Sequence, residues 1–107
     1  MIEFAGMLKQ RIRIERSLDL RDQSGLQQQG WETVATSFAA ITADGTGAEE
    51  VGQALSSMPR YRVTIRVRDG IAVGQRVLWK ERAMLVKQRI DDPMTPDRIL
   101  LVCEEMR

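Results

Sequence analysis

Apolar and polar residues alternate along several short stretches of this chain, as they do in strands with one buried face. The clearest stretch is 61–68, where the two classes of residue fall on opposite parities. Its apolar positions are Tyr61, Val63, Ile65 and Val67, and its polar positions are Arg62, Thr64, Arg66 and Arg68. Asp69 and Gly70, which follow, are typical of a turn. The pattern predicts a strand with an apolar face and three guanidinium groups opposite, near an acidic strand, subunit or nucleic acid.

Two further stretches show strand patterns before this one. In 8–16, alternation predicts that Leu8, Ile12 and Ile14 point inward, and that Lys9, Arg11, Arg13 and Glu15 point outward. Residues 31–43 are rich in small and β-branched residues and predict a long strand. Its apolar residues change parity along the strand, so we expect a bulge or bend near 35–37. Residues 1–7 could form a short helical turn.

Three shorter strands are predicted at 76–80, 83–90 and 98–104, with a hairpin at 80–82 and a proline-containing loop at 91–97. Residues 17–30 are polar and predict a long loop or mobile hairpin. Residues 48–57 predict the one short helix, with Glu49 and Glu50 in its first turn. The expected fold is mainly β: a single domain over 1–107, forming a small antiparallel barrel of five to six strands with one short helix and long loops.

Charge is unevenly distributed along the chain. The net charge is +1, but residues 60–89 hold nine Lys or Arg against only Asp69 and Glu81. Such segregation suits nucleic-acid binding, and it also suits a protein whose copies pack a basic side against an acidic side. We favour the second interpretation. For the three arginines of 61–68, a solvated strand face paired with glutamates is as well supported as an interface.

The chain offers little for catalysis or metal binding. It has no histidine, and its single cysteine, Cys103, follows Leu101 and Val102 as a small buried hydrophobe would. Adjacent carboxylate pairs such as Asp91 and Asp92 do not converge on a strand. We therefore expect no enzymatic activity, metal or cofactor. One cysteine fits a reducing compartment, and no apolar run or signal peptide indicates a membrane. Trp31 and Trp79 could stack bases, but core packing is the better explanation.

Several motifs follow one another along almost the whole chain in a recognisable order. They are Leu8-Lys-Gln-Arg-Ile-Arg-Ile-Glu-Arg16, Arg21-Asp22 with Gly25, Trp31-Glu-Thr-Val-Ala-Thr36 with Ala39-Ala-Ile41, the segment Gly45 to Met58, Arg62-Val-Thr-Ile-Arg66, Asp92-Pro93 and Leu101-Val-Cys-Glu104. This order resembles the head–tail joining, or head-closure, proteins of long-tailed bacteriophages. The chain departs from the family pattern in its short helical segment and in Phe38, where that family often has tryptophan.

The resemblance implies a structural virion protein rather than an enzyme. It implies a homo-oligomeric ring of twelve copies in the virion neck, assembled in the host cytoplasm, with the portal adaptor protein above it and the tail terminator or completion protein below. Packaged double-stranded DNA would pass through its lumen, and the ring would retain that DNA and dock the tail. The alternative is an OB-like barrel that binds single-stranded nucleic acid through its basic block and tryptophans.

Three groups of residues are the candidate sites. Subunit or adaptor contacts are predicted for Arg11, Arg13, Arg62, Arg66 and Arg68, because they lie on the polar faces of strands. An interface loop is predicted at Arg21, Asp22 and Gly25. A channel-facing gate is predicted at Gly45, Gly47, Glu49, Glu50 and Gln53, where glycines allow hinge motion and glutamates repel phosphate.

Overall fold

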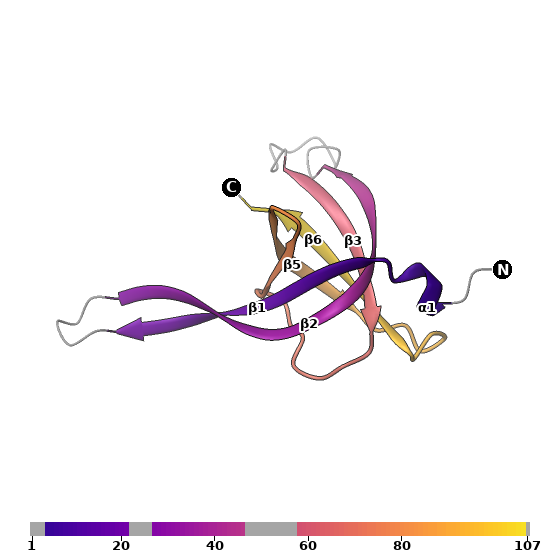
Figure 1. Ribbon diagram of the computed structural model, residues 1–107, viewed down its shortest axis with the longest axis horizontal. Helices are drawn as coiled ribbons and strands as arrows, with labels where there is room; N and C mark the ends of the chain where they lie inside the picture. The colour runs from indigo at the N-terminus through magenta and orange to yellow at the C-terminus, as the bar shows by residue number, and fades with distance from the viewer. Residues whose placement is uncertain (1–3, 22–26, 47–57, 107) are drawn as a thin grey trace.

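The computed structural model describes residues 4–21, 27–46 and 58–106. In this part of the chain a one-turn helix is followed by six strands (Figure 1). These elements are α1 (Phe4–Met7), β1 (Gln10–Arg21), β2 (Gln27–Thr46), β3 (Pro59–Arg66), β4 (Arg76–Trp79), β5 (Arg82–Ile90) and β6 (Arg98–Glu105). The predicted helix over 48–57 lies outside the described residues.

The six strands close into an antiparallel barrel in the order β1-β2-β3-β6-β5-β4. Closure comes from β1, which pairs with β2 on one edge and with β4 on the other. The predicted fold class is confirmed. Because the order is circular, β1 and β6 are separated by two strands in each direction and lie on opposite sides of the barrel. The predicted hairpin at 80–82 is confirmed as the turn between β4 and β5.

The barrel interior is filled by aliphatic side chains from the inward face of the strands. Its fully buried members include Ile12, Ile14, Val63, Ile65, Val77, Met84, Val86, Ile99, Leu101 and Cys103. The expected inward positions of 8–16 and 61–65 are confirmed. Val67 was expected to be inward, and this is wrong: its side chain is 50% exposed. The strand ends at Arg66, and the Val67 N–H donates to the carbonyl of Asp97 in a loop.

A bulge in β2 explains the change of parity that the sequence showed. Ile14 is paired with Ala35 and Glu15 with Thr33, which leaves Val34 as the extra residue. The expected bulge therefore exists, just before the interval of 35–37. After it Ala35 and Ala39 point into the barrel. Before it, Trp31 lies on the same side of the ribbon as the outward-facing residues of β1.

Beyond the barrel, β1 and β2 continue together as a two-stranded ribbon (Figure 1, left). Register continues without a further irregularity from Ser17 opposite Trp31 to Arg21 opposite Gln27. We call residues 17–21 with 27–31 the hairpin arm. The prediction of a long loop over 17–30 is wrong for these residues, whereas the alternative of a hairpin is confirmed by the pairing of β1 with β2, and the mobility predicted for it stays a prediction. Gly25 and the other residues of 22–26 lie outside the described part.

Candidate assembly interface

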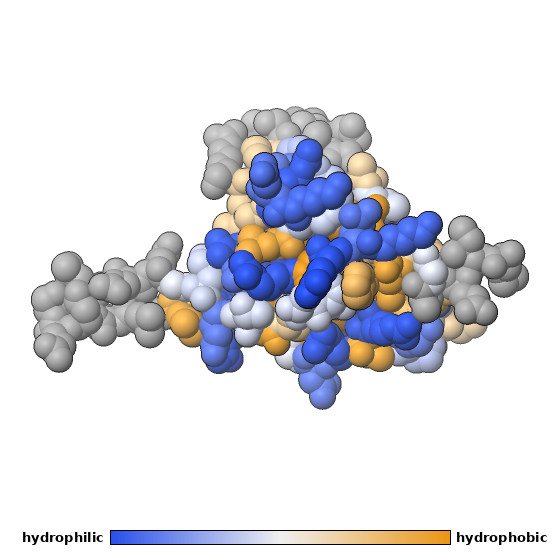
Figure 2. Space-filling model, viewed as in Figure 1, coloured by the Kyte–Doolittle hydropathy of each residue, from blue (hydrophilic) through white to orange (hydrophobic). Residues whose placement is uncertain are grey.

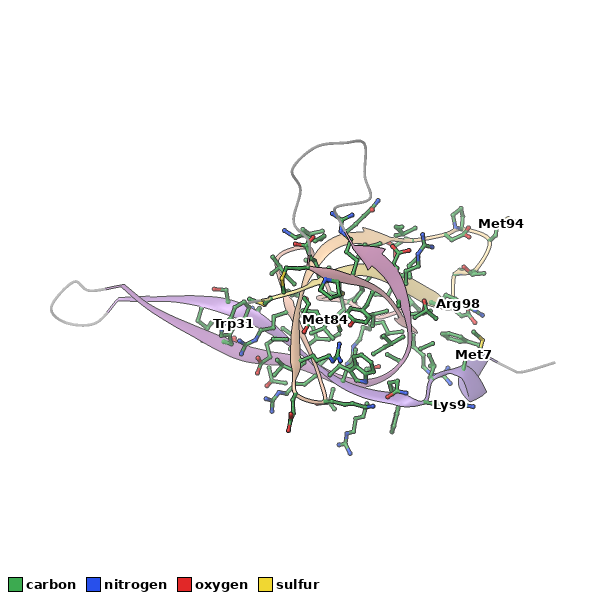
Figure 3. All side chains as sticks on the ribbon, turned by 90° about the horizontal axis from the view of Figure 1, so that it is seen from above. Met7, Lys9, Trp31, Met84, Met94 and Arg98 are labelled. Atoms are coloured by element: carbon green, nitrogen blue, oxygen red, sulfur yellow. The ribbon has the colours of Figure 1, made fainter. Side chains whose placement is uncertain are left out.

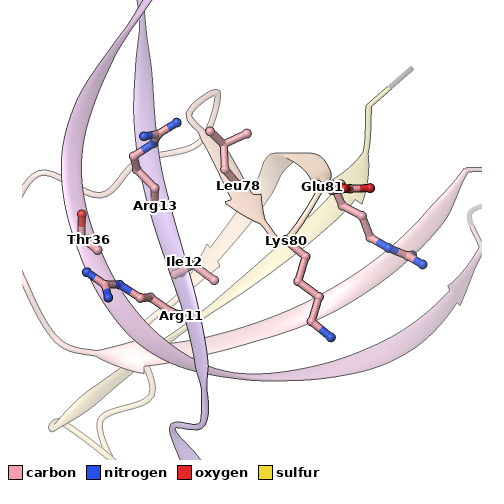
Figure 4. A pocket seen from close by; sticks show the side chains of 8 residues that line it. Arg11, Ile12, Arg13, Thr36, Leu78, Lys80 and Glu81 are labelled. Carbon is pink, nitrogen blue, oxygen red and sulfur yellow. The ribbon is translucent and has the colours of Figure 1, made fainter.

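An open basic groove lies on the outer face of the barrel, between β1 and the β4–β5 turn (Figure 4). Its volume is about 460 Å³. Its lining is Arg11, Ile12, Arg13, Thr36, Leu78, Lys80, Glu81 and Arg82. Because barrel closure pairs β1 with β4, Arg13 sits opposite Leu78, and the charged β4–β5 turn is brought beside Arg11. The groove holds four cations and one carboxylate, so it suits an acidic partner.

The cations of the groove differ in how far they are already neutralised. Within the described residues, Arg11 has no ion-pair partner, and the Lys80 ammonium lies only over the Trp79 ring, 5.2 Å from its centroid. Arg82 donates to the Tyr61 hydroxyl at 2.6 Å and lies 3.6 Å from Glu105. Arg11 and Lys80 are therefore the groove cations most available to a partner.

Next to the groove, Glu15 is buried between two arginines. Arg76 donates to Glu15 Oε1 from Nε at 2.9 Å and from Nη2 at 2.6 Å, and Arg13 Nε lies 3.3 Å from Oε2. The expectation that Glu15 is solvent-exposed is wrong, since only 8% of its side chain is accessible. Arg76 causes this burial, and its guanidinium is also stacked 4.2 Å from the centroid of Trp31. The cluster fixes the root of the hairpin arm to the barrel.

The arginines of 61–68 do not form one strip. Arg62 and Arg66 are exposed on the outer face of β3, as expected, but Arg68 lies beyond the strand in the β3–β4 loop. Arg62 Nε donates to Asp44 of β2 at 3.1 Å. The Arg66 guanidinium lies 5.7 Å from the ring centroid of Phe4. The expected rigid strip of three guanidinium groups is therefore wrong, because β3 is too short to carry the third.

The loop between β5 and β6, residues 91–97, carries three carboxylates and no Lys or Arg, and we call it the acidic loop. Asp91 is paired with Arg89 through two contacts of 3.0 Å, and Asp97 with Arg98 at 3.0 and 3.3 Å. The hydrogen bond from Arg98 lowers the pKa of Asp97. Asp92 instead accepts the N–H of Met94 at 2.8 Å, and no cation within the described residues pairs with it.

The remaining predicted site residues are only partly described. Arg21 ends β1 and its backbone pairs with Gln27, while its side chain and Asp22 fall outside the described part. Gly45 lies within β2. Gly47, Glu49, Glu50 and Gln53 also lie outside the described residues. The interface-loop and gate predictions therefore stay predictions.

The described residues show neither a reactive cysteine nor a metal-binding cluster. Burial raises the pKa of Cys103 to about 12, as befits a core side chain rather than a nucleophile. No group of three or more His, Cys, Asp or Glu in the described part of the chain could hold a metal ion. Its one helix, α1, is too short to cross a membrane.

The sequence did not identify the groove residues that barrel closure brings beside β1. Leu78, Lys80 and Arg82 were not singled out, although they line the groove with Arg11 and Arg13. The available signal was the charged hairpin at 80–82, whose place beside β1 depends on the pairing of β4 with β1. Trp79 packs against the core and edge-on to Tyr61 at 5.9 Å, as expected. Core packing was also expected for Trp31, and this is wrong: Trp31 lies outside the core cluster, under the guanidinium of Arg76.

Comparison with known proteins adds the decisive observation. The family model described as phage head completion protein matches residues 5–106. The chain belongs to this family. Its members are structural virion proteins, so the resemblance noted from the motifs is confirmed, and the chain is a virion component.

Two solved structures share the fold. The solution structure of protein SF1141 from Shigella flexneri 2a has a TM-score of 0.70 and 23% identity, with 96% of each chain covered. A chain in the virion of a native gene transfer agent particle has a TM-score of 0.66 and 17% identity, covering 92% of this chain and 96% of that one. No curated protein sequence matches this chain.

Proposed function

We propose that this chain forms a ring, of twelve copies, in the neck of the virion. The ring closes the filled head, retains packaged double-stranded DNA and presents the surface on which the tail docks. It sits between the portal adaptor and the tail completion protein, and it is assembled in the host cytoplasm. Membership of the head completion family over residues 5–106 is the observation that supports this proposal most strongly.

The charge distribution on the barrel also favours a ring. A ring is built from heterologous contacts, in which one surface of a copy meets a different surface of the next. Figure 2 shows polar side chains gathered over the face on which β1 lies. Arg11 and Arg13 belong to this outer face, whereas the carboxylates of the acidic loop precede β6 on the opposite side. In the proposed ring, Arg62, Arg66 and Arg68 contact the adaptor or a subunit.

Two segments have more specific proposed roles. The hairpin arm, with Arg21, Asp22 and Gly25, is ordered against a neighbouring copy or the adaptor. The segment with Gly45, Gly47, Glu49, Glu50 and Gln53 faces the channel and switches between retention and release of DNA. Both proposals rest on the sequence pattern and on family membership.

An OB-like barrel for single-stranded nucleic acid is the weaker candidate. Such proteins stack bases on exposed aromatic rings. Trp79 is packed against the core, and Trp31 is covered by Arg76. Trp79 therefore offers no open ring, and Trp31 has one face of its ring already occupied by a guanidinium.

Particles that lack the chain provide the test. Heads should package DNA and then lose it, and tails should not attach, because the docking surface is missing. Electron microscopy of purified particles, combined with measurement of nuclease-resistant DNA, would score both defects. Expression of the unaltered chain in trans should restore both. If particles without the chain keep their DNA and carry tails, the proposed function is wrong.

A further inference from the structure

Two turns hold the acidic loop in a compact, projecting shape, and we also call this loop the knob. The Thr95 N–H donates to the carbonyl of Asp92 at 3.0 Å, and the Arg98 N–H donates to that of Thr95 at 3.3 Å, so two turns follow each other. Pro93 and Pro96 restrict the backbone further. A loop that is already ordered loses little conformational entropy when it binds. It is suited to insertion into a preformed groove.

The knob presents one charged and one apolar group side by side. Asp92 has no cation partner in the described part of the chain and lies two residues from Met94, whose side chain is 85% exposed. An exposed methionine is an adaptable apolar contact, because its unbranched side chain fits irregular surfaces. The loop therefore offers a carboxylate together with a flexible apolar anchor.

The basic groove presents the complementary pair. Arg11 and Lys80 are its most available cations, and the half-buried Leu78 lies on β4, opposite Arg13 of β1 (Figure 4). A carboxylate near Arg11 and Lys80 would gain two charge-assisted contacts. A thioether over Leu78 would remove apolar surface from water. The cations of the groove therefore complement the carboxylate of the acidic loop, and the apolar surface of Leu78 complements its methionine.

The positions of the two surfaces suit a ring. The groove is built on β1, and the acidic loop leads into β6, which is on the opposite side of the barrel. In Figure 3, Met94 and Lys9, which directly precedes β1, both lie at the end of the barrel that carries α1, above and below it in this view, and Met7 of α1 lines a hollow together with Asp92. Within the described residues Asp92 pairs with no cation of its own chain and Arg11 with no carboxylate, whereas in a ring each copy can place its acidic loop in the groove of the next.

We propose that the acidic loop of one copy seats in the basic groove of the adjacent copy, with Asp92 against Arg11 and Lys80, and Met94 over Leu78. The inference rests on the proposed function, since it names the lateral contact of the ring. A duplex DNA backbone is the competing occupant. It would satisfy the cations, but it would meet the Glu81 carboxylate at the edge of the groove and would leave Leu78 without an apolar partner.

Cross-linking tests the proposed neighbours directly. Particles are made with a chain carrying Arg11→Cys and Asp92→Cys, and are treated with a short bis-maleimide. Buried Cys103 should stay unmodified in the folded chain. We expect a ladder of covalent multimers, because each copy would be linked to the next. The matched control is Lys87→Cys with Asp92→Cys, which places the first cysteine on the exposed face of β5, outside the groove, and should give no ladder.

The outcomes separate this contact from the function on which it rests. If the Arg11→Cys, Asp92→Cys particles close and take tails but form no multimers, the contact is wrong and the proposed function stands. A ladder only from the Lys87→Cys control would also overturn the contact. If particles lacking the chain are normal, the proposed function itself has failed.

Charge exchange provides a second test that needs no added cysteine. Asp92→Arg or Arg11→Asp alone should raise the chain concentration needed for assembly about tenfold, within the range of one close charge pair at an interface. Both changes in one chain should restore assembly, which sedimentation would measure. Lys87→Asp on β5 alters the same charge outside the groove and should leave assembly unchanged.

Binding of fluorescent duplex DNA separates the competing occupant. We expect Arg11→Asp to leave the affinity for DNA unchanged. If Arg11→Asp weakens DNA binding and the double variant fails to restore assembly, the groove binds phosphate and the proposal is overturned.

Discussion

Strands β1 and β2 run through two different environments, the barrel and the hairpin arm. In the barrel each has a neighbour on both edges: β1 pairs with β2 and β4, and β2 pairs with β1 and β3. In the arm they pair only with each other, and none of the other strands in the described part of the chain pairs with them there. A lone two-stranded ribbon is marginal in water, because it has no face to bury. The barrel therefore provides the stability, and the arm depends on other contacts.

The side chains reflect this difference. Within the barrel, Ile12 and Ile14 are fully buried, whereas Ser17 at the start of the arm is exposed. The same strand thus changes from core-forming to solvent-facing within a few residues.

The largest expected difference between the two regions is in thiol reactivity. Cys103 in β6 is buried, and burial raises its pKa to about 12, so labelling at pH 8 requires the barrel to open. Ser17→Cys, combined with Cys103→Ala, places the only thiol at the start of the arm. We expect Cys103 to react at least about a thousandfold more slowly, because opening a core strand approaches the global free energy of unfolding. Maleimide labelling followed by mass spectrometry measures both rates.

The same raised pKa predicts the direction of a pH effect. A thiol whose pKa is higher in the folded state stabilises the fold fully below its ordinary pKa of 9.0 and loses that contribution as the pH rises toward about 12. Cys103→Ala should therefore lessen the loss of stability between these values. Equal alkaline sensitivity in both chains would contradict the assignment to Cys103.

Removal of core volume should have the next largest effect. Ile65 in β3 is fully buried in the barrel, so Ile65→Ala should lower the free energy of unfolding by about 3 kcal/mol. Leu18→Ala in the arm is the matched control, because it removes an aliphatic side chain that lies outside the core cluster and is only half-buried. Urea titration would measure both, and we expect the arm variant to lose less than about 1 kcal/mol.

These contrasts also explain what could be predicted from the sequence. Ile12, Ile14, Val63 and Ile65 were placed inward because barrel packing imposes a period of two on them. The arm was missed as strand because its glutamine-rich half has no face to bury and hence no alternation. Local pattern is informative only where a core enforces it.

The site was less predictable, since it depends on contacts between distant segments. Glu15 is buried because Arg76, distant in sequence, is its neighbour across the β1–β4 pair. The end of β3, which leaves Val67 and Arg68 outside the strand, follows from a hydrogen bond to the loop carbonyl of Asp97. Arg11 was recognised as an interface candidate, but its closeness to Lys80 required the closed order of the barrel.

Loss of the buried carboxylate should have an intermediate effect. Glu15→Ala leaves Arg76 and Arg13 without their shared acceptor and should lower the free energy of unfolding by about 2 kcal/mol, less than for a fully buried pair because Arg76 is partly exposed. Glu32→Ala, in the pair that directly precedes the arm on β1 and β2, is the control. Its partner Arg16 lies 2.7 Å away but both groups are exposed, so its loss should remain below about 1 kcal/mol. Equal losses in thermal unfolding would remove the distinction between the two regions.

Shortening the arm tests the comparison as a whole. Replacement of residues 19–29 by Asn-Gly joins Leu18 to Gly30, which face each other in the register, through a two-residue turn. The free energy of unfolding should change by less than about 1 kcal/mol, because no core residue is touched. Incorporation into particles should be lost if the arm serves contacts. A shortened chain that unfolds much more easily would show that the arm supports the barrel after all.

The smallest effect on stability is expected at the β4–β5 turn. There, one substitution should raise the stability of the fold and weaken the proposed assembly contact. Lys80 has a φ of 55°, a left-handed conformation that is strained for any residue with a Cβ. Lys80→Gly should therefore raise the free energy of unfolding by about 0.5 kcal/mol, the strain relieved exceeding the added freedom of the unfolded chain. Glu81→Gly is the matched control, since Glu81 has no such conformation and should lose stability instead. If Lys80 serves the groove, Lys80→Gly should be more stable and yet assemble less well. If the Lys80→Gly chain is more stable and also assembles better, Lys80 contributes neither to the stability of the fold nor to the proposed assembly contact.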